Sequence, residues 1–434
     1  MKKNEIYTVD IIDDTNLGYG IAKIDAMVVF IPAVLVGEKV EIAITKVQKK
    51  YAYARVLKII KKSPARIEPS CSVAGRCGGC QLQHLSYAAQ LDFKYKHLKA
   101  LMKDQNVLFP LGAKEPLYYR NKAQFPVQIK DGKVVMGFYR SHSNDIVPCS
   151  SCQIQSHEIN ALYQFFQEHL TVELAEGLRH LFIRYFDKTK EAQIVFIGQQ
   201  KIAWDSLIKE CVRTFPSVKS IVFNTNKRND NVILGEHYEV LYGKDSIYAD
   251  CLSNTIELHF KSFFQVNSQQ MEVLYKEAIK AAELDASMTV VDMYAGTGTI
   301  GLSVAKYVKE VLGVEIVEEA VENAKKNCRL NGITNCTYLC QDASLFAHDL
   351  MMQKKTIDVA FVDPPRKGMN EQGLQDLMTI NPKRIVYVSC NPRTLYRDLQ
   401  WMEKAGYKCQ YIQPVDMFCQ TTGVECVAKI EKMR

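Results

Sequence analysis

The chain has 434 residues, too many for one compact core, so two or three domains are expected. Its composition, 47% hydrophobic and 24% charged, is ordinary for a globular protein, and its longest apolar stretch, residues 27–36, is too short to span a bilayer and contains Pro32. A net charge of +7 permits nucleic-acid binding without demonstrating it, and the first residues lack an apolar signal core, so we expect a cytoplasmic protein without membrane partners.

Residues 1–60 have the pattern of a small β-barrel. Runs rich in β-forming residues cover 6–11, 27–31 and 39–44, with turn residues between them. The next run, 47–56, mixes basic with aromatic side chains, which suits base stacking and phosphate contact in a five-stranded oligonucleotide-binding (OB-like) barrel. A solvated edge strand protected by lysines explains the same residues equally well.

Three cysteines fall within ten residues in the motif Cys71-x5-Cys77-Gly-Gly-Cys80. The fourteen cysteines of a cytoplasmic protein are expected to be reduced, and most would be small buried hydrophobes. A cluster in so turn-rich a stretch instead favours a metal site, with either zinc or an iron–sulfur cluster. A fourth ligand must come from elsewhere in the chain, and Cys149-x2-Cys152 is the nearest pair.

The rest of the chain divides into a mixed region and a regular one. Helical spacing covers 83–105, and mixed patterns follow from about 115 to 255, with strand-like runs at 181–186, 193–197 and 220–223. From about residue 260, strands alternate with helices that include 317–330 and 392–405, which predicts a parallel, doubly wound α/β sheet. The seven expected strands cover 288–294, 310–316, 336–341, 357–363, 384–389, 408–415 and 424–430.

A glycine-rich loop follows the first of these seven strands and predicts a nucleotide-cofactor site. In Gly296-x-Gly298-x-x-Gly301, the glycines let the backbone approach a cofactor, and Glu315, at the end of the next strand, is placed to accept hydrogen bonds from ribose hydroxyls. Alone, the motif does not distinguish a dinucleotide from S-adenosylmethionine. Asp342, after the third strand, could face an adenine amino group, although the role of a helix cap fits it almost as well.

Three further candidates lie at strand ends in this region. Asp363 ends the fourth strand and precedes two prolines, which fix the chain so that the carboxylate points into the crevice at the carboxyl edge of the sheet. Cys390 ends the fifth strand in Ser-Cys-Asn-Pro, before a helix whose N-terminus can lower a thiol pKa. Glu425 opens the last strand, where burial would suit its pKa to removing a proton. The alternatives are a rigid turn with a solvated acid, an inert cysteine and an ordinary strand-end glutamate.

A thiol and a carboxylate beside a cofactor site are what methylation of carbon 5 of a pyrimidine requires. Thiolate addition to C6 creates an enolate whose C5 attacks a sulfonium methyl group, after which a base removes the C5 proton and elimination frees the thiol. A nicotinamide enzyme needs neither Asp363-Pro-Pro nor Cys390. Cys419, in Phe-Cys-Gln, is similar to the Pro-Cys-Gln nucleophile of DNA cytosine methyltransferases but lacks the proline and lies on the last loop, so we do not expect it to be the nucleophile.

These residues together resemble the S-adenosylmethionine-dependent RNA uracil-C5 methyltransferases, which make 5-methyluridine, and among them the 23S ribosomal RNA type. The resemblance implies a TRAM barrel at 1–60, a central α+β iron–sulfur and RNA-binding domain at 61–255 with a helix at about 83–110 packed on the catalytic domain, and a Rossmann-like methyltransferase domain at 256–434. It implies that a [4Fe–4S] cluster is held by the motif cysteines and by the cysteine that precedes Gln153-Ile154-Gln155. The ligand set is therefore Cys71, Cys77, Cys80 and Cys152.

The same resemblance assigns roles to single residues. Phe263-Phe-Gln265-Val-Asn267 is similar to a family segment in which the glutamine contacts the cofactor and the first phenylalanine lies by the target base, and Tyr119-Arg-Asn-Lys122 is similar to a stretch that contacts RNA. Tyr294, Glu315 and Asp363 fall on cofactor and substrate positions. Cys390 falls on the nucleophile, and Glu425 falls on the base.

Two departures from the family pattern stand out. Residues 416–425 read Asp-Met-Phe-Cys-Gln-Thr-Thr-Gly-Val-Glu, without the usual proline and histidines before the base, and Ala295 replaces a common cysteine. The main expectation is a monomeric enzyme that acts on a uridine of 23S ribosomal RNA. The alternatives are the same reaction on the T-loop of transfer RNA and a catalytically degenerate RNA-binding protein.

Overall fold

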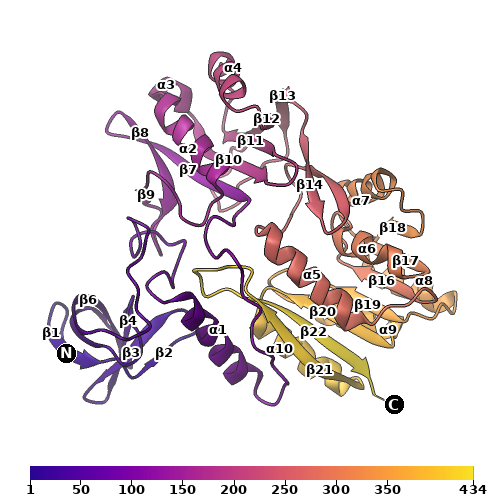
Figure 1. Cartoon of the computed structure of the whole chain (residues 1–434), viewed down its shortest axis with the longest axis horizontal. Coiled ribbons are helices and arrows are strands. Elements are labelled where there is room, and N and C mark those ends of the chain that lie inside the picture. The colour runs from indigo at the N-terminus through magenta and orange to yellow at the C-terminus, as the bar shows by residue number, and fades with distance from the viewer. Residues whose placement is uncertain (434) are drawn as a thin grey trace.

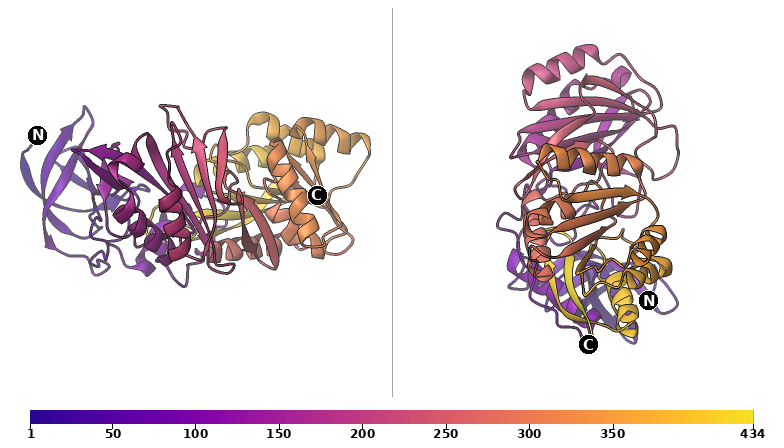
Figure 2. Two further views of the ribbon diagram at one scale, coloured as in Figure 1. Left: turned by 90° about the horizontal axis from the view of Figure 1, so that it is seen from above. Right: turned by 90° about the vertical axis from the view of Figure 1, so that its right-hand side faces the viewer.

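The computed structural model describes residues 1–433, in which the strands form three large sheets and one two-stranded hairpin. Figure 1 shows helix α1 (Tyr87–Met102) between the N-terminal sheet and the C-terminal sheet, with the central sheet above them in this view. In Figure 2 the molecule is elongated, and the N-terminal sheet lies at one end of it. No helix within residues 1–433 has both the length and the apolar character that a membrane crossing requires.

The N-terminal sheet curls around its own core. Its six strands have the order β1-β5-β6-β4-β3-β2, and within the described residues the edge strands β1 and β2 do not pair with each other. The alternating pattern buries one face, where Val29, Ile31, Val40 and Ile42 are fully covered. The three expected strands are confirmed, whereas the strand expected from residue 47 starts at Tyr51, because residues 48–50 turn the chain. The strands are β1 Ile6–Asp10, β2 Asp13–Asp14, β3 Tyr19–Ile24, β4 Met27–Pro32, β5 Lys39–Val47 and β6 Tyr51–Lys61.

Helix α1 connects the N-terminal half of the chain to the C-terminal sheet. It begins after Ser86, whose backbone is extended, and ends at Lys103, which has a positive φ of 41°. Leu98 and Met102 are buried in the same core as Ile412 of the C-terminal sheet, and the chain after α1 runs beside that sheet. The helix therefore belongs to the packing of the C-terminal region although it lies far from it in sequence.

The central sheet is mixed, with the strand order β13-β12-β11-β10-β7-β8-β9. The expected runs at 181–186, 193–197 and 220–223 are the buried strands β10, β11 and β12. Helices cover one face, where Trp204 stacks on Phe196 at 4.7 Å between ring centroids. The elements are β7 Lys122–Lys130, β8 Lys133–Tyr139, β9 Ile146–Pro148, α2 His157–His169, α3 Val172–Ala175, β10 Leu178–Phe186, β11 Glu191–Gly198, α4 Asp205–Thr214, β12 Val218–Thr225 and β13 Tyr238–Gly243, followed by the hairpin β14 Ser246–Cys251 and β15 Asn254–His259.

The C-terminal sheet has seven strands in the order β18-β17-β16-β19-β20-β22-β21, and all seven predicted strands are confirmed. The first five are parallel, and β22 runs antiparallel between β20 and β21. The strand order reverses between β16 and β19, and in such sheets ligands bind beyond the carboxyl ends at that point. The strands are β16 Thr289–Met293, β17 Glu310–Glu315, β18 Cys336–Cys340, β19 Val359–Val362, β20 Arg384–Ser389, β21 Tyr407–Val415 and β22 Glu425–Lys432; the helices are α5 Ser268–Ala282, α6 Thr299–Val304, α7 Glu318–Leu330, α8 Ala343–Met352, α9 Glu371–Ile380 and α10 Pro392–Lys404, with a short 3-10 helix η1 Ala305–Tyr307.

Candidate active site

Cys390 and Glu425 come together at the ends of two paired strands. The antiparallel register of β20 and β22 pairs Ser389 with Cys426, so Cys390 lies at the position opposite Glu425. Glu425 also pairs with Val415 of β21, which fixes its backbone from the other side. The strand pairing thus brings a thiol and a carboxyl from distant positions in the chain to one edge of the sheet.

The surroundings of Glu425 favour its protonated form. Its side chain is buried, with 2% of its surface exposed, and its Oε2 atom has no hydrogen-bond partner among the described residues. Burial, together with the charge of Asp363, raises the pKa of Glu425 to about 8, although Arg366 opposes the shift. A carboxyl group with such a pKa can accept a proton near neutral pH and return it to solvent afterwards.

The pKa of the half-buried Cys390 thiol differs from the sequence-based expectation. Burial, together with the charges of Glu425 and Asp363, raises the pKa of Cys390, and Arg366 lowers it only in part. The N-terminus of α10 therefore does not produce the low thiol pKa that the sequence suggested, because two acids and a partly apolar setting outweigh it. Arg366 has a role that the sequence analysis missed, although its place directly after Asp363-Pro-Pro was a signal.

Asp363 follows β19 and acts electrostatically on the same pair. Burial raises its pKa to about 7. The turn after it is held by α10, because Asn391 Nδ2 donates to the carbonyl of Arg366 at 2.9 Å and Asp398 accepts from the Met369 amide at 2.9 Å. The strand end and the helix after Cys390 are thus joined by hydrogen bonds, so Asp363 and Cys390 keep a fixed relation.

The glycine-rich loop opens the space beside these residues. Gly296 and Gly298 have positive φ values of 53° and 81°, which favour glycine, and a side chain at Gly296 would meet nothing within 4 Å. Glu315 accepts a hydrogen bond from the Gly296 amide at 3.0 Å, so this acid braces the loop as well as ending β17. Tyr294 also has a positive φ, of 62°, and its hydroxyl lies against Gly373 of α9.

Asp342 is exposed and caps α8, where it accepts a hydrogen bond from the Ser344 amide at 2.8 Å. The cap, which the sequence left as an alternative to a cofactor contact, is therefore present. Aspartate at this position satisfies an amide at the start of the helix and is favoured by the helix dipole. One carboxylate oxygen is used in this way, which leaves the other for a further contact.

Gln265 is joined to the segment 119–122 by backbone and side-chain contacts. The Asn121 amide group donates to the Gln265 carbonyl at 2.8 Å and to Ser268 at 2.9 Å. The Gln265 residue is 5% exposed, whereas Phe263 is 67% exposed beside it. The structure thus brings together two segments that the sequence had linked to cofactor and to RNA, and it leaves a large aromatic ring free at their edge.

The four predicted cluster cysteines lie in one region. Cys71, Cys77, Cys80 and Cys152 are half-buried, and burial, together with the charges of the other three thiols, raises the pKa of Cys80 to about 12. The turn at Cys77-Gly-Gly-Cys80 is held against Arg140 by a strand-like bridge. Among residues 1–433, however, no three His, Cys, Asp or Glu side chains converge closely enough to hold a metal ion.

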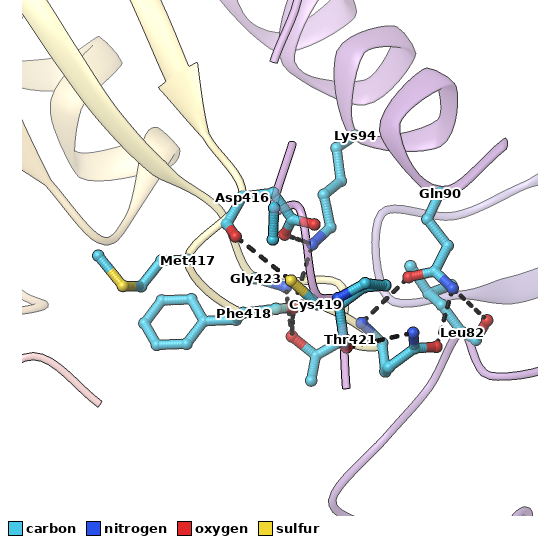
Figure 3. A network of polar contacts seen from close by, with 12 residues as sticks. Leu82, Gln90, Lys94, Asp416, Met417, Phe418, Cys419, Thr421 and Gly423 are labelled. Atoms are coloured by element: carbon cyan, nitrogen blue, oxygen red, sulfur yellow. Dashed lines mark hydrogen bonds and ion pairs between the residues drawn. The ribbon is translucent and has the colours of Figure 1, made fainter. Parts of the chain in front are cut away.

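The loop between β21 and β22, residues 416–424, departs from the family pattern and contains Cys419. Figure 3 shows that its side chains and carbonyl groups contact α1, through Lys94 and Gln90. Cys419 is fully buried, burial raises its pKa to about 12, and its sulfur contacts the Asp416 carbonyl at 3.5 Å. This thiol is part of the packing of the loop, and its polar neighbours differ from the acids that surround Cys390.

The chain is similar over almost its whole length to proteins described as RNA methyltransferases. The family described as tRNA (Uracil-5-)-methyltransferase matches residues 86–433, and the TRAM domain matches residues 2–57. Uncharacterized RNA methyltransferases of Halalkalibacterium halodurans and Oceanobacillus iheyensis are each 41% identical, covering 99% of this chain and 98% and 97% of theirs. A solved structure of the tRNA (uracil-54, C5)-methyltransferase of Pyrococcus abyssi, in complex with S-adenosyl-L-homocysteine, is 26% identical with a TM-score of 0.74, covering 98% of this chain and 100% of that one.

Proposed function

Because the chain belongs to the tRNA (uracil-5-)-methyltransferase family, we propose that it uses S-adenosylmethionine to methylate C5 of a uridine in RNA through Cys390 and Glu425. The observation that carries the proposal is the placement of Cys390 opposite Glu425, with Asp363 beside them. A nucleophile for C6 and a base for the C5 proton are the two groups that uracil-C5 methylation demands of a protein.

Each side chain has a distinct part in the reaction. The Cys390 thiolate adds to C6 of the uracil, and the electron pair of the C5–C6 double bond moves toward O4, which makes C5 nucleophilic. Bound S-adenosylmethionine supplies an electrophilic methyl group. Glu425 then takes the C5 proton, the C5–H electron pair re-forms the double bond, and the C6–S bond breaks to return the thiolate. Asp363 faces the uracil and keeps Glu425 basic enough to accept the proton.

The residues that would hold the cofactor surround the glycine-rich loop. Gly296 leaves open space above the loop, and Glu315 braces it from β17. We assign Gln265, Tyr294, Glu315, Asp342 and Asp363 to this site. The assignment is supported by the position of Tyr294, Glu315, Asp342 and Asp363 near the carboxyl ends of β16, β17, β18 and β19. The strand order reverses between β16 and β19.

The RNA is proposed to be 23S ribosomal RNA. The N-terminal match to the TRAM domain and the cysteine motif support this choice, whereas the family description and the Pyrococcus abyssi enzyme name transfer RNA. We accordingly divide the chain into an OB-like RNA-binding barrel at 1–60, a central domain at 61–255 and a methyltransferase domain at 256–434.

A [4Fe–4S] cluster on Cys71, Cys77, Cys80 and Cys152 is proposed for the central domain. Support comes from the all-thiol donor set and from the position of Cys80, whose pKa is raised by burial and by the charges of Cys152, Cys77 and Cys71. The side chains would need to converge further to share one cluster. No step of the methyl transfer is assigned to it.

The test is transfer of labelled methyl from S-adenosylmethionine to separated ribosomal and transfer RNA from cells that lack the gene. We expect label in 5-methyluridine of 23S RNA with the wild type and none with Cys390→Ala. Label in transfer RNA alone would overturn the ribosomal target and keep the chemistry. Tight RNA binding without label in either RNA would point to the degenerate RNA-binding protein.

A further inference from the structure

Helix α1 carries three polar side chains along one stripe, two of them buried and one half-buried. Tyr87, Gln90 and Lys94 are three and four residues apart, so they lie on the same face of the helix. Gln90 is fully covered, and Lys94 is 2% exposed. A helix face that packs against a sheet is normally apolar, and burying amide and ammonium groups is costly unless they are paired. This polar stripe therefore calls for a reason beyond packing.

Two members of the polar stripe hold the start of the loop 416–424. The Lys94 ammonium forms an ion pair with the Asp416 carboxylate, and it donates to the Phe418 carbonyl at 3.1 Å. The Tyr87 hydroxyl donates to the other oxygen of Asp416 at 2.7 Å and accepts from the Ala113 amide at 2.6 Å. Both charges of the buried ion pair are thus satisfied by partners.

Gln90 holds the tip of the same loop through a reciprocal pair of bonds. Its Oε1 atom accepts from the Gln420 amide at 3.0 Å, and its Nε2 atom donates to Gln420 Oε1 at 2.9 Å. The Gln420 carbonyl also accepts from the amides of Gln81 and Leu82 at 3.1 and 3.0 Å, and Gln90 Nε2 donates to the Leu82 carbonyl at 3.2 Å. The loop tip is therefore fixed between α1 and the segment that directly follows Cys80.

The loop held by α1 ends directly before Glu425, the proposed base. Val415 and Glu425, which flank the loop, are a paired position of β21 and β22, so the loop leads directly into the backbone of Glu425. The Oε2 atom of Glu425 has no hydrogen-bond partner among residues 1–433. With no such bond to hold the carboxyl group, its position depends on the backbone and on the packing around it.

We propose that the polar stripe Tyr87, Gln90 and Lys94 positions Glu425 for removal of the C5 proton. The inference rests on the proposed function. These residues touch neither RNA nor cofactor; they act through the loop 416–424. In the reaction, their effect falls on the last step, where Glu425 takes the proton and the C6–S bond breaks, and spares the addition of Cys390 and the methyl transfer that precede it.

The experiment follows one turnover of the full-length enzyme on its RNA. Methyl label in the RNA is measured together with the fraction of labelled RNA that remains bound to protein on a denaturing gel. Gln90→Met and Tyr87→Phe should slow release by about tenfold or more, because a misplaced catalytic group loses much of its rate, while label incorporation stays within about twofold of wild type. Gln410→Met is the matched control, since Gln410 is exposed on β21 and its side chain has no partner among the described residues.

The outcomes distinguish a positioning role of the stripe from a purely structural one. Release at the wild-type rate in both variants, or an equal loss of methyl transfer and release, would overturn the proposal and leave the stripe a structural feature. If Gln90→Met does not fold, Tyr87→Phe decides, because it removes only one hydroxyl. A wild type that incorporates no methyl into any RNA would overturn the proposed function itself, and this inference with it.

Discussion

Cys390 and Glu425 face each other across β20 and β22, because the register that pairs Ser389 with Cys426 places the next two residues opposite one another. The negative charge of Glu425 raises the pKa of the thiol. A thiolate and a carboxylate are therefore disfavoured together in the free protein. For the proposed reaction we therefore expect Cys390 to add to the uracil while Glu425 is protonated, and Glu425 to remove the proton once the sulfur is bonded to carbon.

Substitution of Cys390 and substitution of Glu425 should block different steps of the reaction. Cys390→Ala removes the adduct, so C5 never becomes nucleophilic, and neither methylated nor covalently bound RNA should form. Glu425→Gln permits addition and methyl transfer but not removal of the C5 proton, so methylated RNA should remain bonded to Cys390 on denaturing gels. The control is RNA containing 5-fluorouridine, which should trap the wild type in the same way. Free methylated RNA from Glu425→Gln at the wild-type rate would remove Glu425 from the mechanism.

Release of the product should depend on pH through Glu425. The base must be deprotonated, and the pKa of Glu425 is raised to about 8, so the release rate should rise as pH increases toward 8 and level off above it. Asp363→Asn removes a negative neighbour and should shift this rise to lower pH. Single-turnover release measured over the range from about pH 6 to 9 tests the point. A profile that falls with increasing pH would show that another group accepts the proton.

We expect Cys419 to contribute to the stability of the fold and not to methyl transfer. It is fully buried against Asp416 and Tyr87, so Cys419→Ala should lower the free energy of unfolding by about 1–2 kcal/mol and leave methyl transfer nearly unchanged. Urea denaturation and the labelled-methyl assay give the two quantities. A 5-fluorouridine RNA bonded to Cys419 rather than to Cys390, located by peptide mass, would reverse the assignment of the nucleophile.

The cysteine region should bind iron and sulfide. Protein prepared without oxygen should be brown and contain about four irons per chain. Cys152→Ala should lose the cluster, whereas Cys149→Ala is the matched control, because Cys149 is nearby, is buried, and is not among the thiols that act on Cys80. Stoichiometric zinc without sulfide would reject the iron–sulfur cluster. Loss of iron in Cys149→Ala but not in Cys152→Ala would show that Cys149 is the fourth ligand in place of Cys152.

The N-terminal sheet should contribute RNA affinity and little cofactor affinity. Lys49 and Lys50 lie in the turn between β5 and β6, Tyr51 and Arg55 lie on β6, and all four are exposed. Tyr51 packs edge-on against Tyr53 at 5.6 Å between centroids. Replacing the three basic residues by alanine should weaken RNA binding by roughly tenfold at moderate salt and flatten its salt dependence, with S-adenosylmethionine affinity unchanged. Removal of residues 1–60 should act in the same direction. Equal RNA affinity in all forms would give that sheet another role.

Much of the C-terminal region follows from local sequence. Buried parallel strands are short apolar runs with helices between them, so all seven strands could be located before the sheet was known. Strand ends carry Asp363 and Cys390 to one edge for the same reason, because parallel strands point their carboxyl ends the same way. The chemistry proposed for the site therefore starts from the types of residue at those strand ends.

The pKa of Cys390 and the hydrogen bonds that hold the loop 416–424 depend on the tertiary structure alone. The pKa of Cys390 is raised because Asp363 and Glu425, neighbours only in space, face a partly buried thiol. Gln90 and Gln420 are 330 residues apart and form two hydrogen bonds with each other. No local sequence pattern around either residue predicts this contact. Side-chain hydrogen bonds act over about 3 Å and leave no periodicity in the sequence, whereas burial of an apolar face does. The elements were thus determined by sequence, and the position and charge of Glu425 by the contacts between them.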